Sequence, residues 1–407
     1  MSNKSYWHYL TLAACCCLAL SSLGLVCNCV GVFYSPMAGD LGVGRGTIAV
    51  FATICTLLNG FAAPLFRRAI LRFPLKPVLC AGILISALST AAIAAIHNVW
   101  QLYLLSAIQG ASMSFFCSVP VNLILSNWFE KNHGMATGIA MCFSGLGGAV
   151  FSPLFSMAIT HMGWRPTYAL LGLLVLLIAL PGALFVLKLT PAERNLLPYG
   201  ATGTPSVSQR PDAAKAAAPA VGFGLPFVML SAAGILAAFN TGISQHLPGF
   251  AESVGLGTAV GATMLSAVML GNLSSKLIIG VISDWLKPIR ACLLMLSCVI
   301  VAIMLLIFFG ASHLFVSLLS SYLIGYVYGV ASVGMPLVTK QVFGLDQFGL
   351  VYPRINVAVS VGSACALAFI GFIYDFTHSY TAAFLCCASF LLISGTLMLM
   401  LQFKKSR

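Results

Sequence analysis

Lys276 is the residue of this 407-residue chain whose chemical type fits its surroundings least well. It lies in GNLSSKLIIG (residues 271–280), within a run of more than twenty apolar and small polar residues that contains no acidic residue. A lysine at the centre of a bilayer costs ~2.5–3.5 kcal/mol on insertion scales. Such a residue needs a compensating partner, and a bound anion would supply one.

Three roles are open for Lys276. Its flexible stem could carry the ammonium group to the cytoplasmic surface, but eight residues, or about 12 Å of helix, separate it from Asp284 near the helix end. It could instead meet a structural partner, such as the C-terminus of another helix. We favour the third role, in which the cation faces a cavity and binds an anion.

Asn272 precedes Lys276 by four residues, so both side chains lie on one face of a helix. Leu265, Met269 and Gly280 extend the same stripe. The amide could hydrogen-bond a substrate or hold the ammonium group in place. The alternative is an asparagine that only packs helices together.

The composition shows which elements must position these side chains. The chain is 60% hydrophobic and 7% charged, whereas soluble domains carry about 25% charged residues. Its successive apolar runs have the length that crosses a bilayer core, so we predict an all-α polytopic membrane protein with twelve transmembrane helices. The predicted spans lie near 8–34, 46–66, 78–96, 100–126, 135–160, 166–187, 225–249, 258–282, 291–310, 314–339, 352–374 and 380–402.

The net charge of +12 reflects membrane topology. With the N-terminus inside, the cytoplasmic segments hold 17 of the 20 basic residues, counting Lys188 at the edge of the linker and Arg354 at a predicted helix start. These segments are the loops RRAILRFPLK, EKNHG, DWLKPIR and TKQVFGLDQ, the central linker and both tails. The positive-inside rule therefore predicts cytoplasmic N- and C-termini in a multi-pass protein of the cell (inner) membrane. Basic patches interleaved with aromatic residues, which are typical of nucleic-acid binders, are absent, so no nucleic acid is expected.

The fourteen cysteines predict neither disulfides nor a metal site. They lie in apolar spans without a CxxC pair, as small buried hydrophobic residues do. We expect no cofactor.

Two halves of six helices are predicted, at residues 1–189 and 225–407. The cytoplasmic linker between them, 190–224, is rich in Pro, Ala and Gly, which predicts flexibility. Residues 144–172 align without a gap with 359–387, a shift of 215. An even number of spans in each half gives parallel repeats, with substrate near the midplane between the halves.

The sequence GVISDWLKPIR (280–290) resembles the loop motif of the major facilitator superfamily, G-x-x-x-D-x-x-G-R-[RK]. The acidic residue and the trailing basic residues of that motif are present, which implies that Asp284 and Arg290 act in the cytoplasmic gate. The matching loop PLFRRAILRFPLKP lacks the acid. The glycine-rich GIAMCFSGLGGAVFSP resembles the family's close-packing helix. The resemblance implies the major facilitator fold.

A narrower resemblance, to the monocarboxylate and oxalate/formate porters, rests on NWFEKNHGMATGIA, GWRPTYALLG and GNLSSKLIIGVISD. It covers nearly the whole chain except the linker, with motifs specific to the superfamily and only suggestive of the subfamily. In those porters the eighth span carries an arginine that pairs with the substrate carboxylate, and Lys276 stands at that place. Proton-coupled members have an aspartate where this chain has Asn272. Oxalate porters add a second basic residue deep in span 11, which residues 355–374 lack.

Further candidates follow from the resemblance, because spans 1, 4, 7 and 10 line the cavity in this superfamily. Any of these candidates could equally be a packing residue. They are Asn28, Gln109, Asn240, Ser244, Gln245 and Tyr326 in those spans and Asn356 in span 11. Arg354 follows Pro353, which predicts a first helical turn at the cytoplasmic surface. There Arg354 would snorkel or gate, with an anion contact as the alternative. His246 is expected at the interface rather than as a proton carrier.

These observations predict a secondary active transporter, not an enzyme, that moves a small carboxylate by alternating access. One buried cation suits a monocarboxylate better than a dianion. Transport would be proton symport or exchange for a counter-anion, by a monomeric protein in the lipid bilayer. The alternative is an exporter of hydrophobic or cationic molecules, which would favour a buried carboxylate. A membrane-embedded enzyme would need a catalytic group such as a Ser/Lys dyad. It is disfavoured because Ser274 and Ser275 are neighbouring positions on the same helix as Lys276, and such positions do not face one another. A transporter-like sensor would need more than the linker offers.

Overall fold

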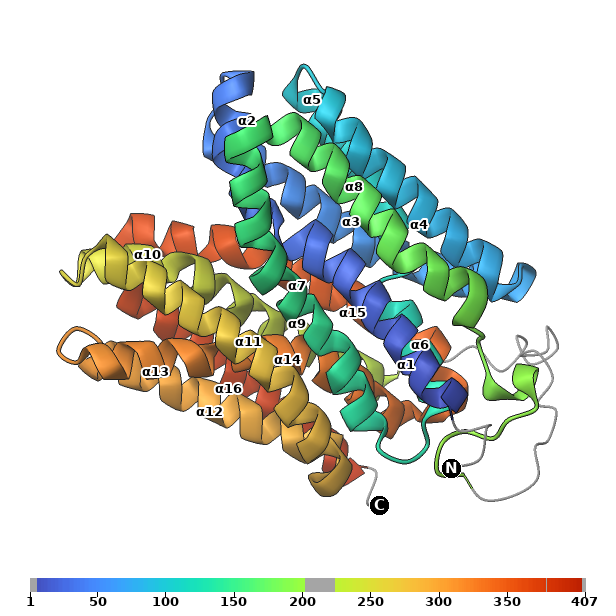
Figure 1. Ribbon diagram of the computed structural model, residues 1–407. Helices are drawn as coiled ribbons and strands as arrows, with labels where there is room; N and C mark the ends of the chain where they lie inside the picture. Colours follow the sequence, from blue (N-terminus) through green and yellow to red (C-terminus); the bar gives the residue numbers. More distant parts are fainter. Residues whose placement is uncertain (1–5, 202–223, 378, 405–407) are drawn as a thin grey trace. The chain divides into compact units, whose positions relative to one another are not determined.

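The computed structural model describes residues 6–201, 224–377 and 379–404. The chain divides into two compact units, Met1–Gly222 and Phe223–Arg407 (Figure 1). The described residues contain 11 helices that are long and apolar enough to cross a membrane. The longest contains two crossings, because Gly344 interrupts it with φ 78° and ψ 172°. The prediction of an all-α protein with twelve membrane helices is confirmed.

The first unit holds six crossings, of which the first, third, fourth and sixth are divided into segments. They are α1 (Tyr6–Ala19) with η1 (Leu20–Asn28), η2 (Val30–Phe33) and α2 (Tyr34–Leu41); α3 (Arg45–Arg72); α4 (Leu75–Ala92) with η3 (Ile93–Ala95); α5 (Val99–Met113) with α6 (Ser118–Trp128); α7 (His133–Met162); and α8 (Trp164–Pro181) with η4 (Gly182–Val186). The short helix η5 (Pro191–Arg194) follows.

The second unit repeats this plan. Its elements are α9 (Leu225–Phe239) with η7 (Asn240–Gly242) and α10 (Ile243–Ser253); α11 (Thr258–Leu286); α12 (Pro288–Phe309); α13 (Leu314–Ile324) with α14 (Tyr326–Gly329) and η8 (Val330–Gly334); α15 (Met335–Thr377), which contains the Gly344 break; and α16 (Tyr380–Lys404). Helix α9 packs on α15 and α16, and α11 packs on α10, α13 and α14.

The first, fourth, seventh and tenth crossings all lose regular α-helical geometry partway along. The first and tenth contain π-helical turns, the fourth turns at 114–117, and the seventh tightens into a 3₁₀ turn. Adding the repeat shift of 215 to 114–117 gives 329–332, which overlaps the irregular turn η8. Irregular turns of this kind occur frequently at functional sites. The backbone irregularities therefore repeat with the sequence.

Close packing of the fifth crossing on the first confirms the role expected for its glycines. A Cβ atom on Gly147 of α7 would lie 2.8 Å from the Cα atom of Gly24 in η1, so only glycines allow this approach. The Asn28 amide donates a hydrogen bond to the carbonyl oxygen of Ser144, at 2.8 Å. Asn28, which the sequence suggested as a cavity residue, therefore takes part in the contact between η1 and α7.

The first part of the linker is held against the first unit. The backbone N–H of Tyr199 donates to the carbonyl oxygen of Trp128 at 2.8 Å. The imidazole of His8 lies 2.8 Å from the carbonyl oxygen of Leu197. The prediction of a flexible linker is therefore wrong for residues 190–201, because backbone hydrogen bonds and aromatic contacts hold them. The rest of the linker lies outside the described residues.

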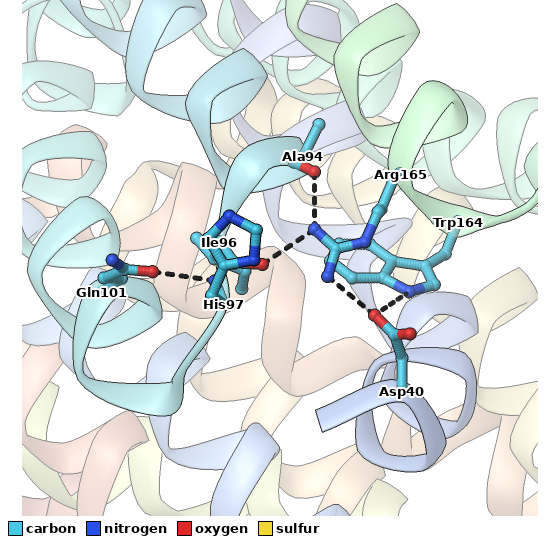
Figure 2. Close-up of polar contacts among 7 residues, drawn as sticks. All are labelled: Asp40, Ala94, Ile96, His97, Gln101, Trp164 and Arg165. Atoms are coloured by element: carbon cyan, nitrogen blue, oxygen red, sulfur yellow. Dashed lines mark hydrogen bonds and ion pairs between the residues drawn. The ribbon is translucent and has the colours of Figure 1, made fainter. Parts of the chain in front are cut away.

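An ion pair joins three crossings at the opposite end of this unit (Figure 2). The Arg165 guanidinium lies 2.8 Å from the carboxylate of Asp40, at the end of α2. It also donates to the carbonyl oxygens of Ala94 and Ile96, at 3.0 and 2.7 Å. The indole N–H of Trp164 reaches the same carboxylate at 3.3 Å. One arginine thus donates hydrogen bonds to two part-buried carbonyl groups where the third crossing ends.

Candidate functional site

Lys276 and Asn272 are both buried in the second unit, each with 4% of its surface exposed. They lie one turn apart on α11, as the sequence predicts. All six acidic side chains that the structure describes are exposed. Asp284, the acidic residue nearest to Lys276 along the helix, is one of them. The buried cation therefore lies on a helix whose own carboxylate points to the exterior.

Two glycines set the position of α11 against the tenth crossing. A Cβ atom on Gly325 would lie 2.7 Å from the backbone nitrogen of Asn272, and one on Gly271 would clash with the carbonyl oxygen of Tyr322. The two backbones therefore touch beside Asn272, one turn before Lys276. Contact between small residues is how membrane helices approach closely. This seam determines which face of α11 carries the two polar side chains.

Hydroxyl groups lie beside this glycine seam, the contact of Gly271 and Asn272 with Tyr322 and Gly325. The Ser274 and Tyr322 hydroxyls lie 2.8 Å apart, and either one can donate. The rings of Tyr322 and Tyr326 meet edge to face, with their centres 5.6 Å apart. Tyr326, a predicted cavity residue, is half-buried. The Ser274–Tyr322 contact lies on a different face of α11 from Lys276, because positions two residues apart on a helix do not face each other.

A second set of polar contacts joins the tenth crossing to the seventh. The Tyr328 hydroxyl lies 2.8 Å from that of Ser244 and 3.1 Å from the carbonyl oxygen of Thr241. Asn240 is fully buried, and its amide nitrogen donates to the carbonyl oxygen of Leu236 at 3.1 Å. Tyr328 thus links the tenth crossing to the seventh.

The side-chain oxygens of Asn240 and Asn272 share one property. Both are buried and have no hydrogen-bond partner among the described residues. An unsatisfied buried polar atom costs ~1–3 kcal/mol, so each is a place where a ligand or water would be stabilised. Neither asparagine is fully accounted for by helix packing.

In the first unit, Gln109 is buried and its amide donates to the Thr90 hydroxyl at 2.6 Å. It also lines a cavity of about 50 Å³ together with Cys27, Cys55 and Thr56. Gln109 therefore both packs and borders an internal space. The other predicted residue of this unit, Asn28, is exposed apart from its bond to Ser144.

Asn59 was not anticipated by the sequence reasoning. It is 9% exposed on α3, and its amide nitrogen has no hydrogen-bond partner in the described part of the chain. Adding 215 gives Ser274, so Asn59 corresponds to the serine beside Lys276 in the other half. An amide within an apolar span, considered together with the repeat, could have identified it. The Tyr322 and Tyr328 contacts carry no such signal, because they depend on which spans meet.

The proposed gate residues Asp284 and Arg290 are both exposed, on either side of the turn at Lys287. That turn has positive φ, 71°, and the backbone N–H of Ile289 donates to the side-chain oxygen of Gln341 at 3.0 Å. The loop between the eighth and ninth crossings is therefore tied to the end of the tenth.

Arg354 requires a correction. The helix that carries it resumes after Gly344, so Arg354 lies ten residues, or about 15 Å, beyond the break and not in a first turn. Pro353 is inside the helix, and Phe348, Tyr352 and Ile355 around it are buried. Arg354 itself is half-buried, as is Asn356. The sequence reasoning failed because it took Pro353 as a helix start, whereas Gly344 supplies the break.

Comparison with known proteins agrees with this architecture. A sequence model of the Major Facilitator Superfamily matches residues 14–356. The chain is 24% identical to monocarboxylate transporter 13 of Bos taurus over 379 residues, 92% of this chain and 84% of that protein. The human organic anion transporter MFSD10 has a similar fold, with a TM-score of 0.71 at 14% identity over 98% of this chain and all of that one. FucP in its outward conformation gives a TM-score of 0.70 at 14% identity, over 97% and 99% of the two chains.

Proposed function

The chain belongs to the Major Facilitator Superfamily of transporters, and we propose that its substrate is a small organic anion, most simply a monocarboxylate. One observation carries this proposal: Lys276 is buried within α11 while every described acidic side chain is exposed. Its relatives include a protein named as a monocarboxylate transporter, at 24% identity. Membership of the family makes the chain a multi-pass membrane transporter and not an enzyme.

The chemistry of the neighbouring groups supports an anion. A carboxylate that approaches Lys276 gains a charge-assisted hydrogen bond, which is about twice as strong as a neutral one. The Asn272 side chain lies one turn from Lys276 on the same helix face, and its amide N–H groups can donate to the same anion. A bound anion neutralises the ammonium group, which lowers the cost of enclosing it away from water.

The number of cations bears on the charge of the substrate. Lys276 alone balances a monoanion, whereas a dicarboxylate would need a second cation. Arg354 is the candidate for that role, because it lies on a helix of the same unit and well inside the helix. We propose a monocarboxylate with Lys276 as its ion partner and Arg354 as a gating residue. A dicarboxylate preference that is lost in Arg354→Gln would contradict this assignment.

Coupling is proposed to involve Lys276 directly. The departure of the anion can be balanced either by the co-transport of a proton or by the binding of another anion at Lys276. The first route gives proton symport and the second gives exchange. Asn272, which occupies the place of a proton-carrying aspartate in related porters, cannot serve as the carrier. We also propose cytoplasmic termini in the inner membrane, from the asymmetry of the loop charges.

An exporter of cations is disfavoured by the same observations. A cation site within the membrane favours a buried carboxylate, and each of the six described carboxylates is exposed.

The test is uptake into proteoliposomes of a panel of labelled mono- and dicarboxylates. We expect Lys276→Gln to abolish uptake and Lys276→Arg to retain part of it, because the arginine preserves the charge. Lys131→Gln, which removes an exposed lysine of the first unit, is the matched control. An imposed pH gradient, compared with anion preloading, separates symport from exchange. Unchanged carboxylate uptake in Lys276→Gln would overturn the proposal.

A further inference from the structure

An open apolar hollow of about 310 Å³ lies in the first unit, where α3 ends and α4 begins. Its walls include Phe73, Pro77, Ala81, Ile85 and Phe115. The one polar lining side chain, Ser112, already donates its hydroxyl hydrogen to the carbonyl oxygen of Gln109 at 2.9 Å. The volume is at the lower end of ligand pockets, which span roughly 300–1,000 Å³. The hollow therefore offers space for an apolar group and no free polar partner within it.

The hollow opens towards the exterior of the protein. Phe73 and Ile85 are 60% and 47% exposed, and Leu84 and Leu88 continue an exposed apolar surface along α4. In a chain that spans the membrane, exposed apolar side chains of this kind contact lipid. The apolar groups available to enter the hollow are therefore acyl chains.

Three basic residues adjoin the lining of this hollow where α3 ends and α4 begins. Arg72 and Lys76 directly precede the lining residues Phe73 and Pro77, and Arg68 directly precedes Ala69, another lining residue. All three basic side chains are exposed. Neither of the two ion pairs found in the described residues involves them. Between Asp40 and Glu130 the sequence contains no acidic residue, so no local carboxylate neutralises this segment.

We propose that this hollow is a binding site for an anionic phospholipid. One acyl chain lies in the hollow, and the headgroup phosphate is held by Arg68, Arg72 and Lys76. The first turn of α4 presents the backbone N–H groups of Leu75 and Lys76, which also favour an anion. Basic pockets between transmembrane helices bind anionic headgroups in this way. The site uses residues distinct from those proposed for transport.

Native mass spectrometry of the detergent-purified full chain tests the proposal, with phosphatidylglycerol and phosphatidylcholine as probes. We expect phosphatidylglycerol to be retained preferentially. In Arg68→Gln/Arg72→Gln/Lys76→Gln that preference should fall by roughly a hundredfold, since each of the three basic residues contributes about fivefold near anionic lipid. The control Lys131→Gln/Lys188→Gln/Lys287→Gln removes the same charge from exposed positions elsewhere and should keep the preference.

Ala81→Trp tests the acyl-chain part separately, because it fills the hollow and leaves the basic residues in place. We expect it to reduce phosphatidylglycerol retention, while thermal unfolding of the variant shows that it is folded. Equal retention of the two lipids by the wild type would overturn the proposal, as would equal losses in the triple variant and its control. A dimer that Ala81→Trp dissociates in the absence of lipid would also overturn it, by identifying a second copy of the chain as the occupant. Retention unchanged by Ala81→Trp would overturn the assignment of the hollow.

Discussion

The hydroxyl groups of Ser274 and Tyr322 lie 2.8 Å apart and join α11 to α13. Ser274 precedes Lys276 by two residues in the sequence. Tyr322→Phe removes this bond and keeps the ring. We expect a three- to tenfold rise in the substrate concentration for half-maximal uptake, because one such bond contributes ~0.5–1.5 kcal/mol.

Ser274→Ala should have a similar effect, and the double variant should be little worse than either single one. Ser389→Ala, in which an exposed serine loses a bond within its own helix, is the control. Fully additive losses would show that the two hydroxyl groups act independently.

The contact of Gly325 with the backbone of Asn272 predicts a stability effect. Gly325→Ala places a methyl group against the Asn272 nitrogen, where a Cβ atom would be only 2.7 Å away. Overpacking of this kind costs ~1–3 kcal/mol, so the thermal unfolding temperature in detergent should fall. Gly39→Ala on α2 meets no atom within 4 Å and should leave it unchanged. Equal unfolding temperatures for both variants would contradict the close approach.

Arg165 and Asp40 should contribute unequally to stability. Arg165→Gln leaves two carbonyl oxygens, those of Ala94 and Ile96, without their donor. We expect a loss of ~1–3 kcal/mol in the free energy of unfolding. Asp40→Asn removes only the ion pair, whose side chains are 42% and 35% exposed, so it should cost ~0–1 kcal/mol. Chemical unfolding of the two variants measures the difference, and an equal cost would show that the ion pair dominates.

His8 should control access of proteases to the start of the linker. His8→Phe retains an aromatic ring against Trp128, whose ring centre lies 5.6 Å away, but loses the hydrogen bond to Leu197. We expect chymotrypsin to cleave after Tyr199 about three- to tenfold faster, in proportion to the ~0.5–1.5 kcal/mol lost. The control is Tyr6→Phe, at an exposed position of the same helix. Chymotrypsin should cleave this variant at the wild-type rate. An unchanged rate in His8→Phe would mean that other contacts hold the segment.

Local and nonlocal features differ in how well the sequence predicted them. The burial of Lys276 and Asn272 on one helix face followed from spacing alone, because helix geometry is local. The depth of Arg354 did not, since it required a choice between Gly344 and Pro353 as the break. A glycine at φ 78° interrupts this helix, while the proline is accommodated inside it.

By itself, the sequence determined that the chain crosses the membrane twelve times and that a cation lies within the eighth crossing. Bilayer thickness, hydropathy and loop charge act on each segment separately, so they can be evaluated without knowing the fold. The tertiary structure decided how Tyr322 and Tyr328 join the crossings, and that residues 190–201 are held in place. It also decided which buried asparagine oxygens lack hydrogen-bond partners among the described residues. These properties depend on contacts between segments distant in sequence. For α11 and the tenth crossing, the close approach at Gly271 and Gly325 sets which helix faces meet.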